Sequence, residues 1–374
     1  YNAIIVSTLN IDRYMGNPSC LCILNKYMQI YQNIGCVVIN YEQRKIQLTG
    51  GSTYIVSLPI KWVRDCGLNS GDTLTLIPQS DCTLLLSADS KMDNRKQESV
   101  IEISQEDTLE DNFRVLVSHY LAGSDLIRLV SSKGFHAMDR KFFKDVTRQR
   151  LIGIEVIEES RNEIVLQSLM NYQELPLDKA LQNMSRLITS MLEDVMLALR
   201  EHDLELARDI VNRDNEVDRF YLLTVRQLKS AVEDPKLAEK IGIERPRQCL
   251  GYRLVTKIIE RIGDHVERIA RQIILMDTVV PEKDAVFAMG NLAQKVFADS
   301  IKALEEKDTK YSNKVVNYAR KFEDYTIMRN EQGTSRCISE QMGSIIESLK
   351  RISEYSADIA EMSINMSSER DRGK

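Results

Sequence analysis

Two stretches of the C-terminal half decide how this chain folds: residues 213–218 read Arg-Asp-Asn-Glu-Val-Asp, and residues 260–270 read Glu-Arg-Ile-Gly-Asp-His-Val-Glu-Arg-Ile-Ala. Each contains two acids four residues apart within a long pattern of helical period: Asp214, Asp218, Glu260 and Asp264. Side chains at this spacing share one face of a helix. Four carboxylates from two helices offer the oxygen ligands that hard and borderline cations prefer, so we expect a metal site.

Acids at this spacing also occur on helix faces that water solvates, where nearby cations neutralise them. The arginines that flank these acids are Arg213, Arg219, Arg261 and Arg268. In the first helix Asp214 falls inside the apolar stripe and Asp218 at its edge, and a buried acid needs a partner. In the second helix Glu260 and Asp264 lie almost opposite the apolar stripe. The sequence therefore leaves a metal site and a solvated face both open.

The composition is that of a soluble chain with ample core. Its 374 residues are enough for two or three domains. Charged residues make up 28% and the net charge is only -5, which is not the basic balance that nucleic-acid binding favours. We find no long apolar run, no signal peptide and no Cys-x-x-Cys pair among the seven cysteines. We therefore expect a cytoplasmic protein with reduced thiols.

The N-terminal region divides into two parts. Residues 1–40 carry three charges and no sustained period, and we assign them to no domain. Residues 41–90 show strand and turn signals in the order β-β-α-β-β, a unit so small that we expect it to dimerise. The phrase Thr49-Gly-Gly-Ser-Thr-Tyr-Ile-Val-Ser-Leu-Pro59, followed by Trp62 and Gly67-Leu-x-x-Gly-Asp72, resembles the AbrB-like swapped-hairpin domain.

The AbrB-like resemblance implies strand pairing between two chains and DNA binding. Within residues 41–95, six basic and six acidic side chains give zero net charge, which does not favour contacts with phosphates. A dimer would still bring two copies of the Arg44-Lys45 pair onto one face. The candidate DNA-binding residues are Arg44, Lys45, Lys61 and Arg64. DNA contact and a role in dimerisation alone both stay open.

The middle segment, residues 98–172, alternates strand and helix signals and predicts a small α/β domain. It contains no phosphate loop of the G-x-x-x-x-G-K type, no G-x-S-x-G elbow and no H-E-x-x-H motif. His119 and His136 stand alone, and we interpret both as structural or exposed. We expect this domain to act as a spacer.

Only helical periods follow Pro176. Six helices are predicted, over residues 178–201, 203–232, 247–277, 282–306, 308–330 and 335–366. Long helices with short links become antiparallel neighbours, so we expect an all-α half of two three-helix bundles, residues 177–278 and 280–366. The chain also repeats itself, since Ile210-Val-Asn212 recurs as Val315-Val-Asn317.

The acid motifs and the helical repeat resemble the PhoU family of phosphate-uptake regulators over about residues 177–366. A chain that joins an AbrB-like domain, an α/β segment and PhoU repeats resembles the archaeal version of that family. The resemblance implies negative regulation of phosphate transport, through transporter components or a phosphate-signalling histidine kinase. It also implies a metal such as iron, zinc or magnesium, held here by Asp214, Asp218, Glu260 and Asp264.

The second repeat departs from the motif. Alignment of the copies places Ala319 where the first copy has Asp214, and Lys350 where the first copy has Glu260. A methyl group and an ammonium group are not ligands for a divalent metal. A weaker, shifted site in this copy stays open, with a solvated surface as the alternative; its candidate residues are Glu323, Glu354 and Asp358.

We therefore predict a dimeric, cytoplasmic regulator that couples phosphate status to transport or transcription and is not an enzyme. The alternative is an AbrB-type DNA-binding transcriptional regulator whose helical half senses a ligand. Phosphoester hydrolysis at the acid cluster is a third hypothesis. It is not favoured because the only histidine beside the acids, His265, falls near the apolar stripe and is expected to be packed.

Overall fold

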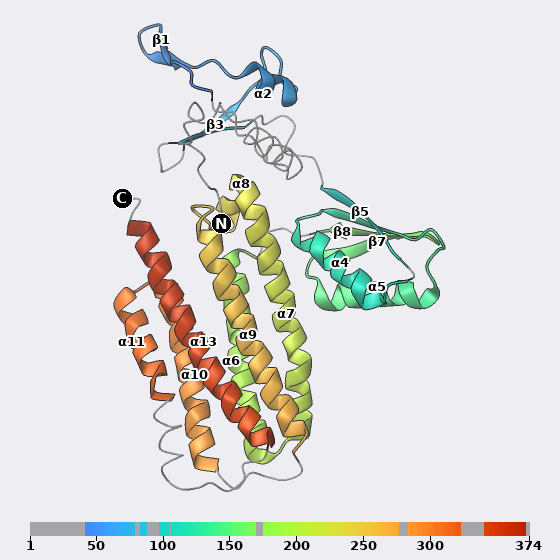
Figure 1. The fold of residues 1–374 in the computed structure, drawn as a ribbon, viewed down its shortest axis with the longest axis vertical. Coiled ribbons are helices and arrows are strands. Elements are labelled where there is room, and N and C mark those ends of the chain that lie inside the picture. Colours follow the sequence, from blue (N-terminus) through green and yellow to red (C-terminus); the bar gives the residue numbers. More distant parts are fainter. Residues whose placement is uncertain are drawn as a thin grey trace, which may run out of the picture. The chain divides into compact units, whose positions relative to one another are not determined.

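A computed structural model describes residues 42–78, 83–87, 97–104, 106–169, 175–276, 283–322 and 340–371. Contacts divide the described chain into two units (Figure 1). The smaller unit comprises residues 42–77 and 84–87, and the larger one comprises the rest. The unassigned segment 1–40 lies outside the described residues.

The smaller unit contains short strands and one short helix. Its elements are β1 (Gln47–Thr49), β2 (Thr53–Ile55), α2 (Ile60–Asp65), β3 (Thr75–Pro78) and β4 (Leu84–Ser87). Strands β1 and β2 pair antiparallel, with Leu48 opposite Tyr54, and β3 pairs with β4. The turn after β1 places Gly50 and Gly51 at φ 63° and 81°, where a side chain would add strain. The expected small sheets are present, while the exchange of hairpins between two chains stays a prediction.

Among its described residues, a single copy of this unit leaves several apolar side chains exposed. On one face of the β1–β2 hairpin, Leu48 is 57% exposed and Tyr54 opposite it is 69% exposed. Ile46 and Val56, which precede and follow these strands, are also exposed. Helix α2 buries none of its residues. The apolar surface therefore lacks the cover that a stable core requires.

The first part of the larger unit is a four-stranded sheet with two helices. The elements are β5 (Glu98–Glu102), α4 (Leu109–Leu121), β6 (Leu126–Val130), α5 (Ala137–Arg150), β7 (Ile154–Glu159) and β8 (Glu163–Ser168). The strand order is β5-β6-β8-β7, with β5 parallel to β6 and the other pairs antiparallel. Helices α4 and α5 lie on the same side of the sheet (Figure 1). Residues such as Leu129, Leu166 and Phe143 fill the core between the layers.

The second part of the larger unit is helical. Its helices are α6 (Leu177–Glu201), α7 (Leu204–Glu233), α8 (Pro235–Lys240), α9 (Gln248–Ile274), α10 (Lys283–Glu306), α11 (Thr309–Ala319) and α13 (Glu340–Asp371). The first four predicted long helices agree with these bounds to within a few residues. The predicted helix over residues 308–330 corresponds to α11, and residues 323–339 lie outside the described residues. The mostly helical C-terminal half is confirmed.

The long helices form two triplets that share one core. Helices α6, α7 and α9 contact one another, as do α10, α11 and α13, and α9 packs along α13 between them (Figure 1). Apolar residues of both triplets form one continuous buried cluster, so neither triplet has a core to itself. In this arrangement α9 touches three other long helices, which leaves little of its circumference to solvent.

The two triplets share the same turn chemistry after their first helix. His202 and Lys307 end α6 and α10 with φ 57° and 55°. The next residues, Asp203 and Asp308, cap α7 and α11, since each carboxylate accepts hydrogen bonds from backbone amides two and three positions later. Both pairs are 105 positions apart, the same offset as the two Val-Asn motifs of the sequence repeat. The repeat in the sequence is therefore also a repeat in the structure.

Arg226 of α7 joins the helical part to the α/β part. Its side chain is fully buried, and its guanidinium donates hydrogen bonds to the backbone oxygens of Tyr120 at 2.5 Å and Gly123 at 3.1 Å. The same group lies 3.6 Å from the carboxylate of Asp125 and 4.9 Å from the ring centre of Tyr120. Leu222, one turn earlier on α7, packs into the α/β core. Helix α7 is thus the attachment surface for the α/β domain.

Among the described residues, none of the helices is both long enough and apolar enough to cross a lipid bilayer. The longest of them, such as α7 and α13, carry charged residues along their whole length.

We expect Arg226→Ala to destabilise the fold by about 3 kcal/mol, because the carbonyl oxygens of Tyr120 and Gly123 lose a charged donor and a cavity opens under the α/β domain. Urea unfolding followed by circular dichroism measures the change. Arg148→Ala is the control, since that side chain is 64% exposed and 3.8 Å from Glu155. The control should cost less than about 0.5 kcal/mol. Equal stability of both variants would contradict the attachment role.

Candidate metal centre

The acid motifs lie where α7 and α9 face each other. Buried Val217 on α7 and Ile262 on α9 fix the rotation of the two helices about their axes. Gly263, the residue after Ile262, faces α7. A Cβ added to it would lie 3.1 Å from a methyl of Val217 and 3.2 Å from the Asp214 carboxylate. The lack of a side chain at Gly263 therefore allows α7 to approach α9 and brings Asp214 against the backbone of α9.

Three of the four predicted ligands converge. Asp218, Glu260 and Asp264 each offer one carboxylate oxygen, and these oxygens all lie within 4.8 Å of one another. Glu260 is buried, with 8% of its surface exposed, while Asp264 lies at the solvent rim. Asp214 is not part of this group of three, but its carboxyl feels the charges of all three. We call Asp214, Asp218, Glu260 and Asp264 the acid cluster.

Three of the four arginines near the motifs contact groups outside the acid cluster. Arg213 pairs with Asp194 at 2.6 Å and Asp209 at 2.8 Å, and Arg219 pairs with Glu216. The guanidinium of Arg261 lies over the ring of Tyr355 on α13. The charge of Arg268 acts on His265. In the described part of the chain, the partners of Arg213, Arg219 and Arg261 are thus groups other than Asp214, Asp218, Glu260 and Asp264.

Burial and mutual repulsion raise the pKa of the acids. Burial, followed by the charges of Asp218 and Glu267, raises the pKa of Asp214 to about 8. Burial, followed by the charge of Glu260, raises the pKa of Asp264 to about 6 and also lifts the pKa of Asp218. A raised pKa means that burial and neighbouring negative charges disfavour the ionised carboxylate more than nearby positive charges stabilise it. The electrostatics of the cluster therefore suit a bound cation.

The donor set also fits a metal ion. All members of the cluster present carboxylate oxygens, which are the ligands of hard and borderline cations. His265, the next residue after Asp264, is not part of the converging set, and its ring lies 5.7 Å from the ring of Tyr355. Burial and the charges of Arg268 and Arg351 lower the pKa of His265. The histidine is thus packed between α9 and α13, as the sequence predicted.

The candidate residues of the second repeat do not converge in the described part of the chain. Glu354 pairs with Arg351 at 2.9 Å and with Lys350 at 3.7 Å, and Asp358 is exposed. Glu323 lies outside the described residues. Within the part of the chain that the structure describes, one set of three acids converges, the one on α7 and α9. A second metal site stays a prediction.

The candidate DNA-binding residues lie on the smaller unit. Arg44 forms an ion pair with Glu42, and Lys45 is exposed in the segment before β1. Lys61 and Arg64 are exposed on one side of α2. This placement leaves them accessible to a partner, and their contact with DNA stays a prediction.

Two basic side chains near the cluster were not predicted from the sequence. Lys257 donates to both carboxylate oxygens of Glu260, one turn later on α9. Arg150, the last residue of α5, lies near Asp218 so that its charge lowers the pKa of that acid. A lysine three residues before an acid is a local signal for the first contact. The second comes from a different domain, for which the sequence carries no signal.

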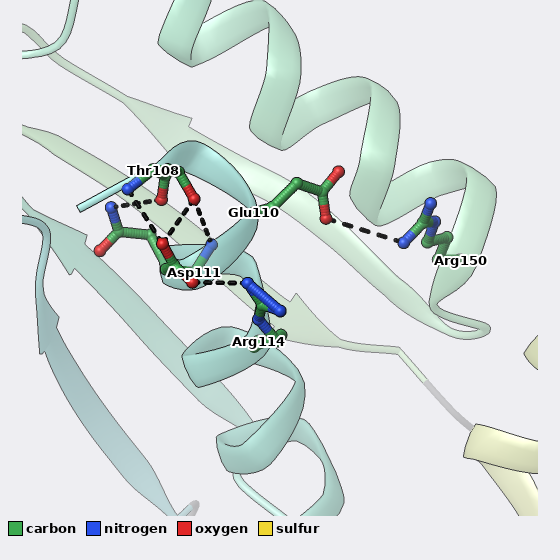
Figure 2. Close-up of polar contacts among 6 residues, drawn as sticks. Thr108, Glu110, Asp111, Arg114 and Arg150 are labelled. Atoms are coloured by element: carbon green, nitrogen blue, oxygen red, sulfur yellow. Dashed lines mark hydrogen bonds and ion pairs between the residues drawn. The ribbon is translucent and has the colours of Figure 1, made fainter.

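The position of Arg150 is set by contacts within the α/β domain. Its guanidinium lies 3.9 Å from the carboxylate of Glu110 on α4 (Figure 2). It also lies 5.7 Å from the ring centre of Phe113 on the same helix. The first turn of α4 is in turn held by a capping box between Thr108 and Asp111 (Figure 2). The α/β domain therefore presents a positive charge to the α7 side of the acid cluster.

Without a bound metal ion, the stability of the protein should fall as the pH rises toward 8. The pKa of Asp214 moves from its ordinary value of 3.8 to about 8 on folding, so the folded state keeps a proton that the unfolded chain releases. This contribution is complete below about pH 4 and is lost as the pH passes about 8. We expect a fall on the order of 2 kcal/mol between about pH 5 and pH 8, because the side chain is partly solvated.

Urea unfolding in a chelating buffer at several pH values measures this dependence. Asp214→Asn should weaken the dependence of the free energy of unfolding on pH, because the amide does not titrate. Asp178→Asn, in the exposed first turn of α6, is the matched control and should leave it unchanged. A profile for Asp214→Asn as steep as that of the wild type would contradict the assignment.

Comparison with known proteins identifies the region that holds the cluster. The PhoU domain family model matches residues 181–273. The "Phosphate-specific transport system accessory protein PhoU homolog" of Streptococcus pneumoniae is 26% identical over 204 residues, which cover 50% of this chain and 88% of that protein. The protein of the same name from Caulobacter vibrioides is 33% identical over 95 residues, which cover 25% of this chain and 38% of that protein.

Solved structures of PhoU proteins are also similar to this chain. The crystal structure of the phosphate transport system regulatory protein PhoU from Streptococcus pneumoniae has 20% identity and a TM-score of 0.44, covering 51% of this chain and 92% of that one. The crystal structure of PhoU from Pseudomonas aeruginosa has the same identity and TM-score and covers 53% of this chain. The span that the PhoU domain family model matches, residues 181–273, carries all four acids of the cluster.

Proposed function

We propose that this chain is a negative regulator of phosphate uptake whose first helical repeat binds a metal ion. The convergence of Asp218, Glu260 and Asp264 within the PhoU domain is the observation that carries this proposal. The relatives of that domain are named as accessory proteins of phosphate-specific transport systems. A role in regulating phosphate transport follows from that relationship.

The acid cluster supplies the ligands for the proposed metal. Asp218, Glu260 and Asp264 hold the ion, and Asp214 joins them when the positive charge of the ion favours its ionised form. Iron, zinc and magnesium all accept carboxylate ligands, and the choice among them depends on supply as well as on affinity. The bound ion offsets the repulsion among the acids and stabilises the contact between α7 and α9.

The proposed partners are components of a phosphate transporter or a phosphate-signalling histidine kinase. The metal-bearing repeat offers a charged surface at the rim of the cluster, where Asp264 is exposed. A change in metal occupancy alters the charge of that surface. Regulation through this repeat requires no catalytic step by the chain itself.

Deletion of the gene for this chain should raise phosphate uptake in phosphate-replete cells, because the negative regulator is lost. Wild-type chain should restore the lower uptake, whereas the chain with Asp218→Ala and Asp264→Ala should not. The purified double variant should also lose most of its bound metal, which elemental analysis measures, because a single buried acid remains among the three converging ligands.

The matched control changes two exposed acids at the end of α10 in the second repeat, Glu305→Ala with Glu306→Ala. This control should keep both the metal content and the lower uptake, since these acids lie outside the converging set. Unchanged metal content in the Asp218→Ala/Asp264→Ala chain would refute the metal site. Unchanged uptake after gene deletion would refute the regulatory role.

A second copy of the chain is the proposed cover for the apolar face of the β1–β2 hairpin. Leu48→Glu should convert the dimer to monomer in analytical ultracentrifugation, because it places a charge within the exposed apolar face. Gln47→Glu adds the same charge to the opposite face of the same strand and should leave the dimer intact. A wild-type chain that sediments as a monomer at micromolar concentration would contradict dimerisation.

A further inference from the structure

Lys257 occupies a distinctive place beside the acid cluster. Its ammonium donates hydrogen bonds to both oxygens of Glu260, whose side chain is only 10% exposed. The same ammonium lies 5.0 Å from the ring centre of Tyr221 on α7. Arg253 donates a hydrogen bond to the Tyr221 hydroxyl at 3.0 Å and so fixes that ring. Lys257 thus touches a cluster acid and an aromatic face at the same time.

We propose that Lys257 is a built-in competitor for the metal ion: its ammonium holds Glu260 while no ion is bound, and an ion must displace it in order to bind. This inference rests on the proposed metal site. It adds that the affinity of the site is set by a residue that is not a ligand.

Charge and geometry both support the competition. The ammonium already engages both oxygens of Glu260, the most buried member of the converging set. A divalent ion ligated by the same carboxylate would lie a few ångströms from the ammonium, and like charges at that distance repel strongly in a partly desolvated site. The charge of Lys257 reaches the other two acids as well, since it lowers the pKa of both Asp218 and Asp264.

The surroundings of Lys257 give the ammonium a place to move. Lysine has a flexible four-carbon stem, so its ammonium can leave Glu260 without any movement of the helix. The face of the Tyr221 ring attracts a cation and already lies within contact range. The ring, whose centre also lies 5.2 Å from the guanidinium of Arg253, gives the displaced ammonium an attractive partner.

The competition predicts opposite effects on two measurable quantities. Removal of the ammonium should strengthen metal binding, because the ion no longer has to displace a cation. It should also lower the melting temperature of the metal-free chain, because Asp218, Glu260 and Asp264 then repel one another with less compensating positive charge. A lysine that only supported the local structure would weaken metal binding when removed.

The test compares Mn²⁺ binding by the full-length wild type, Lys257→Met and Lys257→Arg in isothermal titration calorimetry, after treatment with a chelator. Lys257→Met should bind Mn²⁺ about tenfold more tightly than the wild type, because one unit of opposing charge is removed from the cluster. Lys257→Arg keeps the charge and should bind Mn²⁺ with an affinity close to that of the wild type. Thermal unfolding of the metal-free chains gives the second readout.

Lys302→Met is the matched control. Lys302 on α10 also pairs with an acid on its own helix, Glu306, and lies 5.4 Å from the ring centre of Tyr311, yet it is remote in sequence from the cluster. Its replacement should leave the Mn²⁺ affinity unchanged. Equal or weaker binding by Lys257→Met in a wild type that does bind Mn²⁺ would overturn the competition. Absence of Mn²⁺ binding by every chain would instead refute the metal site on which it rests.

Discussion

The close approach of α7 to α9 is the contact on which the site depends. It exists because Gly263 has no side chain, so that Val217 and Asp214 meet the backbone of α9 directly. The buried stripes of both helices then fix their rotation, and the acids that remain at the edge of the contact face one another. The position of the acids is therefore a result of apolar packing and needs no attraction between them.

This packing forces like charges together. The raised pKa values of Asp214 and Asp264 show that the fold holds these acids against their mutual repulsion and their loss of solvent. A stable fold tolerates such a cluster when compensating charges are near. Lys257 and Arg150 provide part of that compensation from two different domains.

Much of this arrangement was predictable from local pattern. Acids four residues apart within helical periods indicated two helices and one shared site, and the short links of the helical half indicated antiparallel neighbours. The burial of Glu260 was not predictable from its position opposite the apolar stripe, because α9 contacts α6, α7 and α13 and has no broad solvent face. The contacts of Arg226 and Arg150 join residues far apart in the chain, and no periodicity indicates such pairs.

Helix α7 connects the acid cluster to the α/β domain mechanically. It runs without a break from Leu204 to Glu233, with Asp214 and Asp218 in its middle. Leu222 and Arg226 follow Asp218 by about one and two turns. A continuous helix twists and bends little over so short a span, so the segment of α7 from Asp214 to Arg226 moves as one rigid body. Any rotation of α7 that accompanies a change of charge at Asp218 must also displace the α/β domain that Arg226 holds.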